Sequence, residues 1–241
     1  MSSSADRFIT IFSPEGRLWQ VEYAYKAVKQ AEVTAVAAKG KESVIVAVQK
    51  KVQDKLIDPT TVTHMFKITD HVGACLVGLT SDVYYICRRL RYEAALFEHK
   101  NGIEIPVSIL ASRLSEIHQI ESQYSSARPT AVSSILFGYE PSKKDFDLYK
   151  VDPSGVSCGY KAVSCGVKET EALSTLEKKI RPMETTKDTA EFVVSTLQTV
   201  VGADFDPKEI EVAVITKDNT NYRLMNEDEI NIILTAVAEK D

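Results

Sequence analysis

Residues 6–24 of the chain read DRFITIFSPEGRLWQVEYA. The first part, residues 8–12, is apolar and β-branched or aromatic, a composition that prefers an extended backbone. Ser13, Pro14 and Gly16 then occupy the first, second and fourth positions of a preferred type I turn. The stretch therefore predicts an extended arm, a tight turn and the beginning of a helix.

The helix predicted over residues 18–31 is apolar on nearly all of its faces. Two rows at helical spacing are apolar or aromatic: Leu18, Val21, Tyr25 and Val28, and Trp19, Tyr23 and Ala27. Glu22 and Lys26 lie in a narrow charged wedge, at the spacing that favours an ion pair. A helix on a domain surface needs only one apolar stripe. We therefore expect its own domain to cover one side and neighbouring subunits the other; complete burial within its own domain is the alternative.

Composition favours one soluble globular unit. The chain has 241 residues, of which 44% are hydrophobic and 26% charged, enough for one large core. No linker-like segment interrupts it. We therefore predict a single domain over 1–241, with the arm and first helix in 1–31 and the main body in 32–241.

Charge and cysteine usage exclude several functions. The net charge is −5 and no basic stripe is present, which argues against nucleic-acid binding. No apolar run approaches the length that spans a membrane, and the N-terminus lacks the pattern of a secretory signal. Four cysteines are scattered and are expected to be reduced and buried: Cys75, Cys87, Cys158 and Cys165. We expect a protein of the cytoplasm and nucleus, with no membrane or nucleic-acid partner.

Hydrophobic periodicity predicts strand hairpins that alternate with pairs of helices. The predicted strands cover 33–38, 43–49, 65–69, 72–80, 131–139, 146–151, a short pair within 157–166, 211–216 and 222–224. The predicted helices cover 81–101, 106–124, 168–179, 187–201 and a last segment opened by 226–229, with Ser81-Asp82 capping the first. This order predicts an α+β fold in which two packed antiparallel sheets carry helices on both outer faces.

Residues with catalytic or metal-binding chemistry are present but poorly placed. His71 and Cys75 could share one face of a strand, yet their separation along it is too long for a hydrogen bond, so we interpret them as core residues. Three further histidines lack a partner at metal-ligand spacing: His64, His99 and His118. The acids within 204–209 lack the central glycine of a calcium loop. The sequence therefore predicts no catalytic residue, no cofactor and no metal.

The stretch from Asp6 to Ala24 resembles the N-terminal signature of proteasome alpha-type subunits, almost without interruption. Further landmarks of this family follow along the chain: Gln49-Lys50-Lys51-Val52, Arg128-Pro129, Phe137-Gly138-Tyr139, Asp152-Pro153-Ser154-Gly155 and Leu176-Glu177-Lys178-Lys179. The resemblance covers the whole chain. It implies the four-layer αββα sandwich of the N-terminal-nucleophile hydrolases, with an extra N-terminal helix.

The resemblance implies a non-catalytic structural and gating subunit in the outer ring of the 20S core particle, supporting ubiquitin-dependent and ubiquitin-independent protein degradation. The implied partners are six other alpha subunits, the beta subunits of the inner rings, and regulatory ATPase or other activator caps. Catalytic beta subunits expose an N-terminal Thr, whereas Thr34 lies behind an intact arm and helix and has no free α-amino group to act as base. The alternatives are a self-standing N-terminal-nucleophile hydrolase, exposed by cleavage before Thr34, and a scaffold without a link to proteolysis.

The resemblance also implies site residues. Gate and ring-interface positions fall on Ala5, Asp6, Arg7, Pro14, Trp19 and Tyr23. Where this chain has Ala5, the family usually carries Tyr or Phe. His64 stands where many alpha subunits have a Lys that pairs with the C-terminal carboxylate of a docked regulator. Because a neutral imidazole makes a weaker and pH-dependent contact with an anion, we expect weak docking of regulator tails in this activator pocket.

Overall fold

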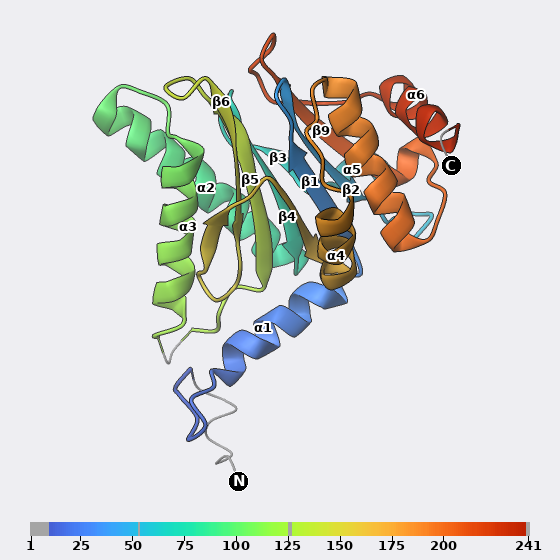
Figure 1. Ribbon diagram of the computed structural model, residues 1–241. Helices are drawn as coiled ribbons and strands as arrows, with labels where there is room; N and C mark the ends of the chain where they lie inside the picture. The colour runs from blue at the N-terminus through green and yellow to red at the C-terminus, as the bar shows by residue number, and fades with distance from the viewer. Residues whose placement is uncertain (1–9, 53, 125–126, 240–241) are drawn as a thin grey trace.

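Residues 10–52, 54–124 and 127–239 are described by the computed structural model. Two five-stranded antiparallel sheets lie face to face, and helices cover the outer face of each (Figure 1). The order of layers is helix, sheet, sheet, helix, which confirms the predicted α+β four-layer sandwich. The extra N-terminal helix, α1 (Trp19–Gln30), lies across one end of the sandwich.

The first sheet gathers strands from both ends of the sequence. Its order is β10 (Arg223–Leu224), β9 (Ile210–Thr216), β2 (Ser43–Gln49), β1 (Thr34–Lys39) and β8 (Ala162–Gly166). Its outer face carries α4 (Glu169–Lys179), α5 (Thr186–Val201) and α6 (Glu227–Ala238). A short 3-10 helix, η3 (Pro207–Glu209), leads into β9.

The second sheet uses consecutive strands. Its order is β3 (Met65–Lys67), β4 (Val72–Gly78), β5 (Val132–Glu140), β6 (Asp145–Val151) and β7 (Ser157–Gly159). Its outer face carries α2 (Thr80–Asn101) and α3 (Val107–Glu121), where Pro106 is the cap residue and not the first residue of the helix. A 3-10 helix, η2 (Pro59–Thr61), precedes β3.

Side-chain alternation along β2 explains the four layers. Every residue of this strand is buried. Ile45 and Ala47 pack in the cluster formed with α5, whereas Val44, Val46 and Val48 pack in the cluster between the two sheets. Successive side chains of a strand point to opposite faces, so a continuous apolar run needs a cover on both sides.

The predicted strand pair within 157–166 is wrong. β7 pairs with β6 in the second sheet, whereas β8 pairs with β1 in the first. The chain changes sheets between the two strands: the Tyr160 amide donates to the carbonyl of Leu148 (2.8 Å), and the Lys161 carbonyl accepts from the amide of Lys39 (2.9 Å). Adjacent residues are thus tied to different sheets, which prevents a local hairpin.

The predicted cap of α2 is also wrong. Leu79 is the cap residue, and its apolar side chain cannot accept a hydrogen bond from the first turn. Ser81 and Asp82 lie inside the helix, and the Asp82 carboxylate has other partners. It accepts hydrogen bonds from both terminal nitrogens of Arg128 (2.6 and 2.7 Å) and from the amide of Ala131 (2.9 Å). This forked contact fixes the segment that enters β5 and so favours the registration of the second sheet.

Gly166 allows β8 and β1 to approach closely where β1 begins. Its φ is +107°, and a Cβ there would lie 2.0 Å from the carbonyl oxygen of Val33. Gly202, after α5, has φ of +70°, but a Cβ there would meet no atom within 4 Å. Both glycines have a backbone conformation that favours glycine, but only at position 166 would a side chain also clash with a neighbour. Comparing them therefore separates the cost of the clash from the cost of the backbone conformation.

We expect Gly166→Ala to lower the free energy of unfolding by about 3 kcal/mol or more, because backbone strain and a clash with Val33 add together. Gly202→Ala should cost only about 1–2 kcal/mol, the backbone contribution alone. Urea denaturation of the full-length variants measures both losses. Equal losses would show that the close approach at Val33 does not constrain position 166.

Candidate functional site

The turn before α1 forms as the sequence predicts. The Gly16 amide donates to the Ser13 carbonyl (2.8 Å), and the Ser13 amide donates to the Arg17 carbonyl (2.8 Å). The Ser13 hydroxyl accepts from the amide of Arg17 (3.2 Å). Gly16 has φ of +76°, a conformation that favours glycine. Pro14 is exposed in this turn, and Ala5, Asp6 and Arg7 lie outside the described residues.

Aromatic and charged side chains stack at the start of α1. The Arg17 guanidinium lies 4.7 Å from the ring centroid of Trp19 and donates to both carboxylate oxygens of Glu22 (2.7 and 3.2 Å). The rings of Trp19 and Tyr23 are 6.4 Å apart, and the Lys26 ammonium lies 5.6 Å from the Tyr23 ring. The predicted pairing of Glu22 with Lys26 is therefore wrong, because Arg17 at the turn reaches Glu22 with its planar fork.

The described part of the chain covers only one side of α1. Val21, Ala24 and Val28 are buried, and the helix packs on β4 and β5. Trp19, Tyr23 and Ala27 are only half-buried. Phe12, just before the turn, is 71% exposed. The described residues before α1 lie beyond the end of the sandwich (Figure 1). The expected cover by its own sheets is confirmed, whereas cover by neighbouring subunits stays a prediction.

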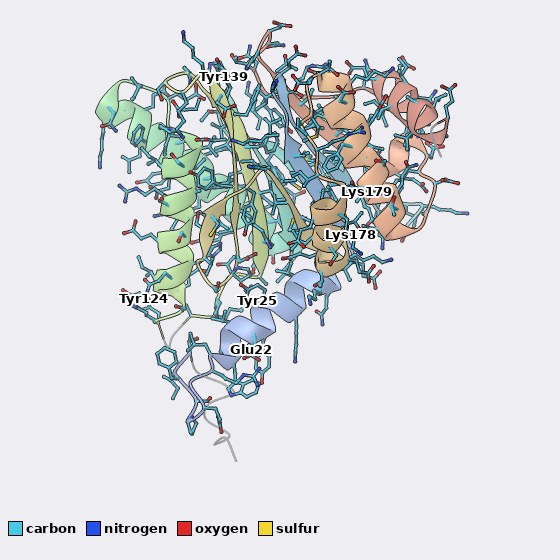
Figure 2. All side chains as sticks on the ribbon, viewed as in Figure 1. Glu22, Tyr25, Tyr124, Tyr139, Lys178 and Lys179 are labelled. Carbon is cyan, nitrogen blue, oxygen red and sulfur yellow. The ribbon has the colours of Figure 1, made fainter. Side chains whose placement is uncertain are left out.

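One hydrogen bond fixes α1 to a turn of the second sheet. The hydroxyl of Tyr25 lies 3.0 Å from the hydroxyl of Ser154 (Figure 2 labels Tyr25), and burial raises the pKa of Tyr25. Ser154 belongs to the predicted type I turn at 152–155, in which the Gly155 amide donates to the Asp152 carbonyl (2.8 Å). The helix is therefore held by a polar contact as well as by its apolar row.

A buried lysine anchors that turn. The Lys150 side chain is 5% exposed, and its ammonium contacts the carboxylates of Asp152 (3.2 Å) and Glu169. Burial alone would lower the pKa of Lys150, but the two carboxylates raise it above its usual range. Asp152 also accepts a hydrogen bond from the hydroxyl of Ser133 (3.0 Å). This network joins β5, β6 and the start of α4 beneath the contact with α1.

A groove of about 440 Å³ connects the far end of α1 with His64. Its walls are the last turn of α1, the residue before β1, the segment 57–64 and the junction of β4 with α2. The sequence-predicted pocket residue therefore lies against α1, although Pro14, Trp19 and Tyr23 lie at the other end of this helix. Lys51 also lines the groove, with its ammonium 3.7 Å from Glu32.

The groove presents His64 as a neutral ring. Its Nδ1 lies 3.3 Å from the carbonyl oxygen of Leu76, which can only accept, so Nδ1 carries the proton and Nε2 the lone pair. Burial lowers the pKa of His64 below its ordinary value. The ring is therefore uncharged at neutral pH, and Lys51 supplies the cation in this groove. Sequence reasoning missed Lys51, although it stands in the family landmark Gln49-Lys50-Lys51-Val52.

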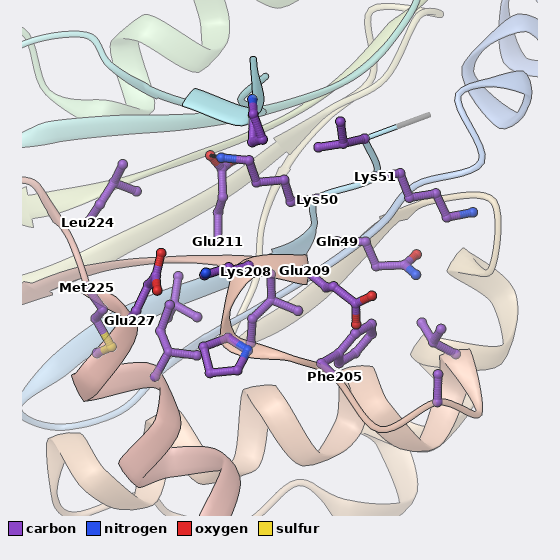
Figure 3. A pocket seen from close by; sticks show the side chains of 18 of the residues that line it. Gln49, Lys50, Lys51, Phe205, Lys208, Glu209, Glu211, Leu224, Met225 and Glu227 are labelled. Carbon is purple, nitrogen blue, oxygen red and sulfur yellow. Dashed lines mark ion pairs between the residues drawn. The ribbon is translucent and has the colours of Figure 1, made fainter. Parts of the chain in front are cut away.

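A cavity of about 1010 Å³ opens beside the first sheet, between the end of β2, η3 and the start of α6 (Figure 3). Lys50 points toward Glu211 in this cavity, with 3.6 Å between their charged atoms. The other carboxylate oxygen of Glu211 accepts from the hydroxyl of Thr63 (3.1 Å) and the amide of His64 (3.0 Å). Glu211 thus lines the cavity and holds two residues that line the groove.

Thr34 begins β1 and is fully buried. Its amide donates to Oε1 of Gln49 (3.0 Å), and the carbonyl of Val33 before it accepts from Val167 (3.0 Å). The nitrogen of Thr34 is therefore an amide with its proton in use, and it has no lone pair that could take a proton from the hydroxyl.

The predicted core position is confirmed for Cys75 and wrong for His71, which lies just before β4 and is partly exposed. Burial is confirmed for Cys87 and Cys165 and wrong for Cys158, which is exposed. Cys75 is fully buried, which raises the pKa of its thiol, whereas His71 contacts Glu104 (3.7 Å) and its Nδ1 lies 3.0 Å from the Thr220 carbonyl. Across residues 10–52, 54–124 and 127–239, no three His, Cys, Asp or Glu side chains gather as metal ligands would. The helices described there are also too short or too polar to span a bilayer.

Comparison with known proteins decides the family. A family model described as "Proteasome subunit" matches residues 28–215, and a second one, for the N-terminal signature of A-type proteasome subunits, matches residues 6–27. The chain belongs to the proteasome alpha subunit family. Alpha-type subunits are generally non-catalytic parts of the proteasome and assemble in it with other alpha and beta subunits.

Relatives in this family match the chain along nearly its whole length. It is 39% identical over 242 residues to the proteasome alpha type-6 subunit of Caenorhabditis elegans, covering 100% of this chain and 98% of that protein. It is 41% identical over 240 residues to the probable proteasome alpha type-1 subunit of Schizosaccharomyces pombe, covering 98% and 97%. It is 34% identical over 235 residues to the proteasome alpha subunit of Methanocaldococcus jannaschii, covering 98% and 88%. The sequence of residues 62–64, 66–69 and 211–212 also resembles the alpha-type 6 member of the family, and the first match agrees with this resemblance.

We expect Tyr25→Phe to loosen α1 of this alpha subunit, because the hydroxyl contact with Ser154 is worth about 0.5–1.5 kcal/mol. Hydrogen exchange should then quicken in α1 before it does in the sheets. Ser154→Ala should have the same effect, and the double variant should add little, since both changes remove one bond. Fully additive effects would show that the two hydroxyls do not interact.

Proposed function

We propose that this alpha subunit is a non-catalytic structural and gating component of the outer ring of the 20S core particle, supporting ubiquitin-dependent and ubiquitin-independent protein degradation. The observation that carries the proposal is the one-sided cover of α1. Its inner row, Val21, Ala24 and Val28, packs on the sheets. The described residues cover the aromatic rings of Trp19 and Tyr23, in the outer row on the other side, only in part, and they leave Phe12 exposed. Interface cores are enriched in such aromatic side chains.

The outer row has an unsatisfied polar group as well. The indole nitrogen of Trp19 is buried, yet it has no acceptor among the described residues. Leaving such a donor without a partner costs about 1–3 kcal/mol, so an acceptor from a neighbouring subunit would be favourable. In this proposal Asp6, Arg7, Pro14 and Tyr23 hold the arm against its neighbours. Ala5 contributes little apolar contact where an aromatic residue is usual, so this arm contributes less to the gate.

The proposed partners are six other alpha subunits, the beta subunits of the inner rings and regulatory ATPase or other activator caps. The proposed location is the cytoplasm and the nucleus, where such particles degrade proteins. A single domain over 1–241 remains our prediction.

We expect the tagged full-length chain, expressed in its native cells, to purify within a core particle, as native mass spectrometry would record. Tyr23→Ala should lower incorporation about tenfold or more, because aromatic residues dominate interface energies. Ile232→Ala is the control, since Ile232 is 65% exposed on α6, remote from α1, and should incorporate normally. A wild-type chain that stays monomeric would refute the proposal. If Tyr23→Ala is incorporated as well as the wild type, α1 does not contribute to the contact with neighbouring subunits.

The self-standing hydrolase is the alternative function. It requires cleavage between Val33 and Thr34, two residues that are both buried. N-terminal sequencing of the native protein distinguishes the two functions: a chain that begins near Met1 or Ser2 supports the ring component. A chain that begins at Thr34 and cleaves fluorogenic peptides would establish the hydrolase.

We also propose that the groove at His64 receives regulator tails weakly. At neutral pH its imidazole offers a lone pair at Nε2, which repels a carboxylate instead of binding it. Lys51 leaves some attraction for the anion. Burial lowers the pKa of His64 most strongly. The charge of Glu211 raises this pKa and that of Lys50 lowers it. Docking should therefore strengthen only under acidic conditions.

We expect His64→Lys to bind a peptide with a free C-terminal carboxylate about tenfold more tightly at pH 7.5, because one added charge contact contributes about 1.4 kcal/mol. The wild type should bind more tightly as the pH falls below the lowered pKa of His64, whereas His64→Gln should not. Fluorescence anisotropy with the same peptide as acid and as amide isolates the carboxylate. Wild-type affinity that does not change between pH 5 and 8 would exclude an electrostatic role for His64.

A further inference from the structure

A basic pocket lies at the end of the sandwich opposite to α1. It has a volume of about 410 Å³ and is formed by the hairpin between β1 and β2, the first residue of β6, and the segment 180–183 between α4 and α5. Its volume falls within the range of small ligand sites, about 300–1,000 Å³. Neither α1 nor the groove at His64 contributes to it.

Backbone contacts hold the walls of this pocket together. The Lys41 amide donates to the Met183 carbonyl (2.9 Å), and the Lys39 amide donates to the Lys161 carbonyl (2.9 Å). A Cβ at Gly40 would lie 2.3 Å from Oγ1 of Thr189 in α5. The hairpin tip therefore packs directly on the helical layer, and the shape of the pocket is set by the fold.

Two of its cations are already positioned by the protein. The Lys39 ammonium donates to the Phe146 carbonyl (2.9 Å) and lies 3.5 Å from the carboxylate of Asp145. The Lys41 ammonium contacts Glu184 at 2.5 Å. Each of these two cations is thus offset by one carboxylate.

Two further cations line the pocket with no ion pair among the described residues. They are Lys161 and Arg181, and both are exposed. Four cations thus surround a pocket with two nearby acids, in a chain whose net charge is −5. This local excess of positive charge runs against the overall charge of the protein and favours an anionic ligand.

The rest of the lining is apolar. Ile180, Pro182 and Met183 contribute to the pocket, and Ile180 is 44% exposed beside the free cations. A lone inorganic anion would leave this apolar surface in water. A peptide with carboxylates on either side of an apolar side chain would use both parts, since guanidinium pairs with carboxylate in a forked geometry and apolar contact removes the exposed area.

We propose that this pocket binds an acidic peptide segment of a partner protein, with its carboxylates at Lys161 and Arg181 and an apolar side chain against Ile180 and Pro182. The site is separate from the proposed ring contact of α1. Binding is expected to weaken steeply with salt, because the paired charges are exposed.

The test measures binding of the fluorescein-labelled peptide ELEELE to the full-length chain by fluorescence anisotropy. The labelled peptides QLQQLQ and EGEEGE are the comparison ligands, and inorganic phosphate is the competitor. We expect ELEELE to bind, and QLQQLQ and EGEEGE to bind at least tenfold more weakly. Excess phosphate should displace it no better than sodium chloride of equal ionic strength. No binding of ELEELE would refute the proposal. Equal binding of EGEEGE, or efficient displacement by phosphate, would replace it with a simple anion site.

Paired variants locate the contact on the protein. Lys161→Gln with Arg181→Gln should weaken ELEELE binding about tenfold or more, whereas Lys178→Gln, an exposed lysine of α4 outside the pocket (Figure 2), should change it less than twofold. All these side chains are exposed, so the melting temperatures should agree. An equal loss in Lys178→Gln would show that general surface charge, not this pocket, attracts the peptide.

Discussion

The architecture depends on one constraint: both faces of β1 and β2 are apolar and must be kept from water. One face meets the second sheet and the other meets α4 and α5, so neither a single sheet nor a two-layer sandwich would satisfy the chain. The open end of the two sheets then remains, and α1 closes it with Val21, Ala24 and Val28. The helix is thus required by the sandwich, while its outer row remains available for other contacts.

Closure by α1 also determines how β1 begins. The chain runs from α1, across the end of the sheets, directly into β1. The nitrogen of Thr34 is therefore part of a peptide bond, and its proton is donated to Gln49. The polar attachment of Tyr25 to Ser154 rests on a turn that Lys150 holds from below. The end of the sandwich that α1 covers is therefore held by both apolar and polar contacts.

Local signals were sufficient for much of this fold. The turn at 13–16, α1 and β2 follow from residues that are neighbours in the sequence, so their patterns predicted them. The separation of β7 from β8 depends on Tyr160 and Lys161 meeting different sheets, which no local pattern contains. For the same reason the partners of Asp82 and Glu22, and the place of Lys51 beside His64, became evident only from the structure.

The strands of the second sheet are close together in the sequence, whereas those of the first sheet are spread over most of the chain. The second sheet uses β3 to β7 in an unbroken run, so every strand of it lies between residues 65 and 159. The first sheet joins β1 and β2 to β8, β9 and β10, and is incomplete until residue 224. During synthesis from the N-terminus the second sheet can therefore pair its strands while the first still lacks three of its own. Until α4 and α5 have been synthesised, the apolar faces of β1 and β2 that pack against these helices stay uncovered, and we expect the nascent chain to be most prone to aggregation in this interval.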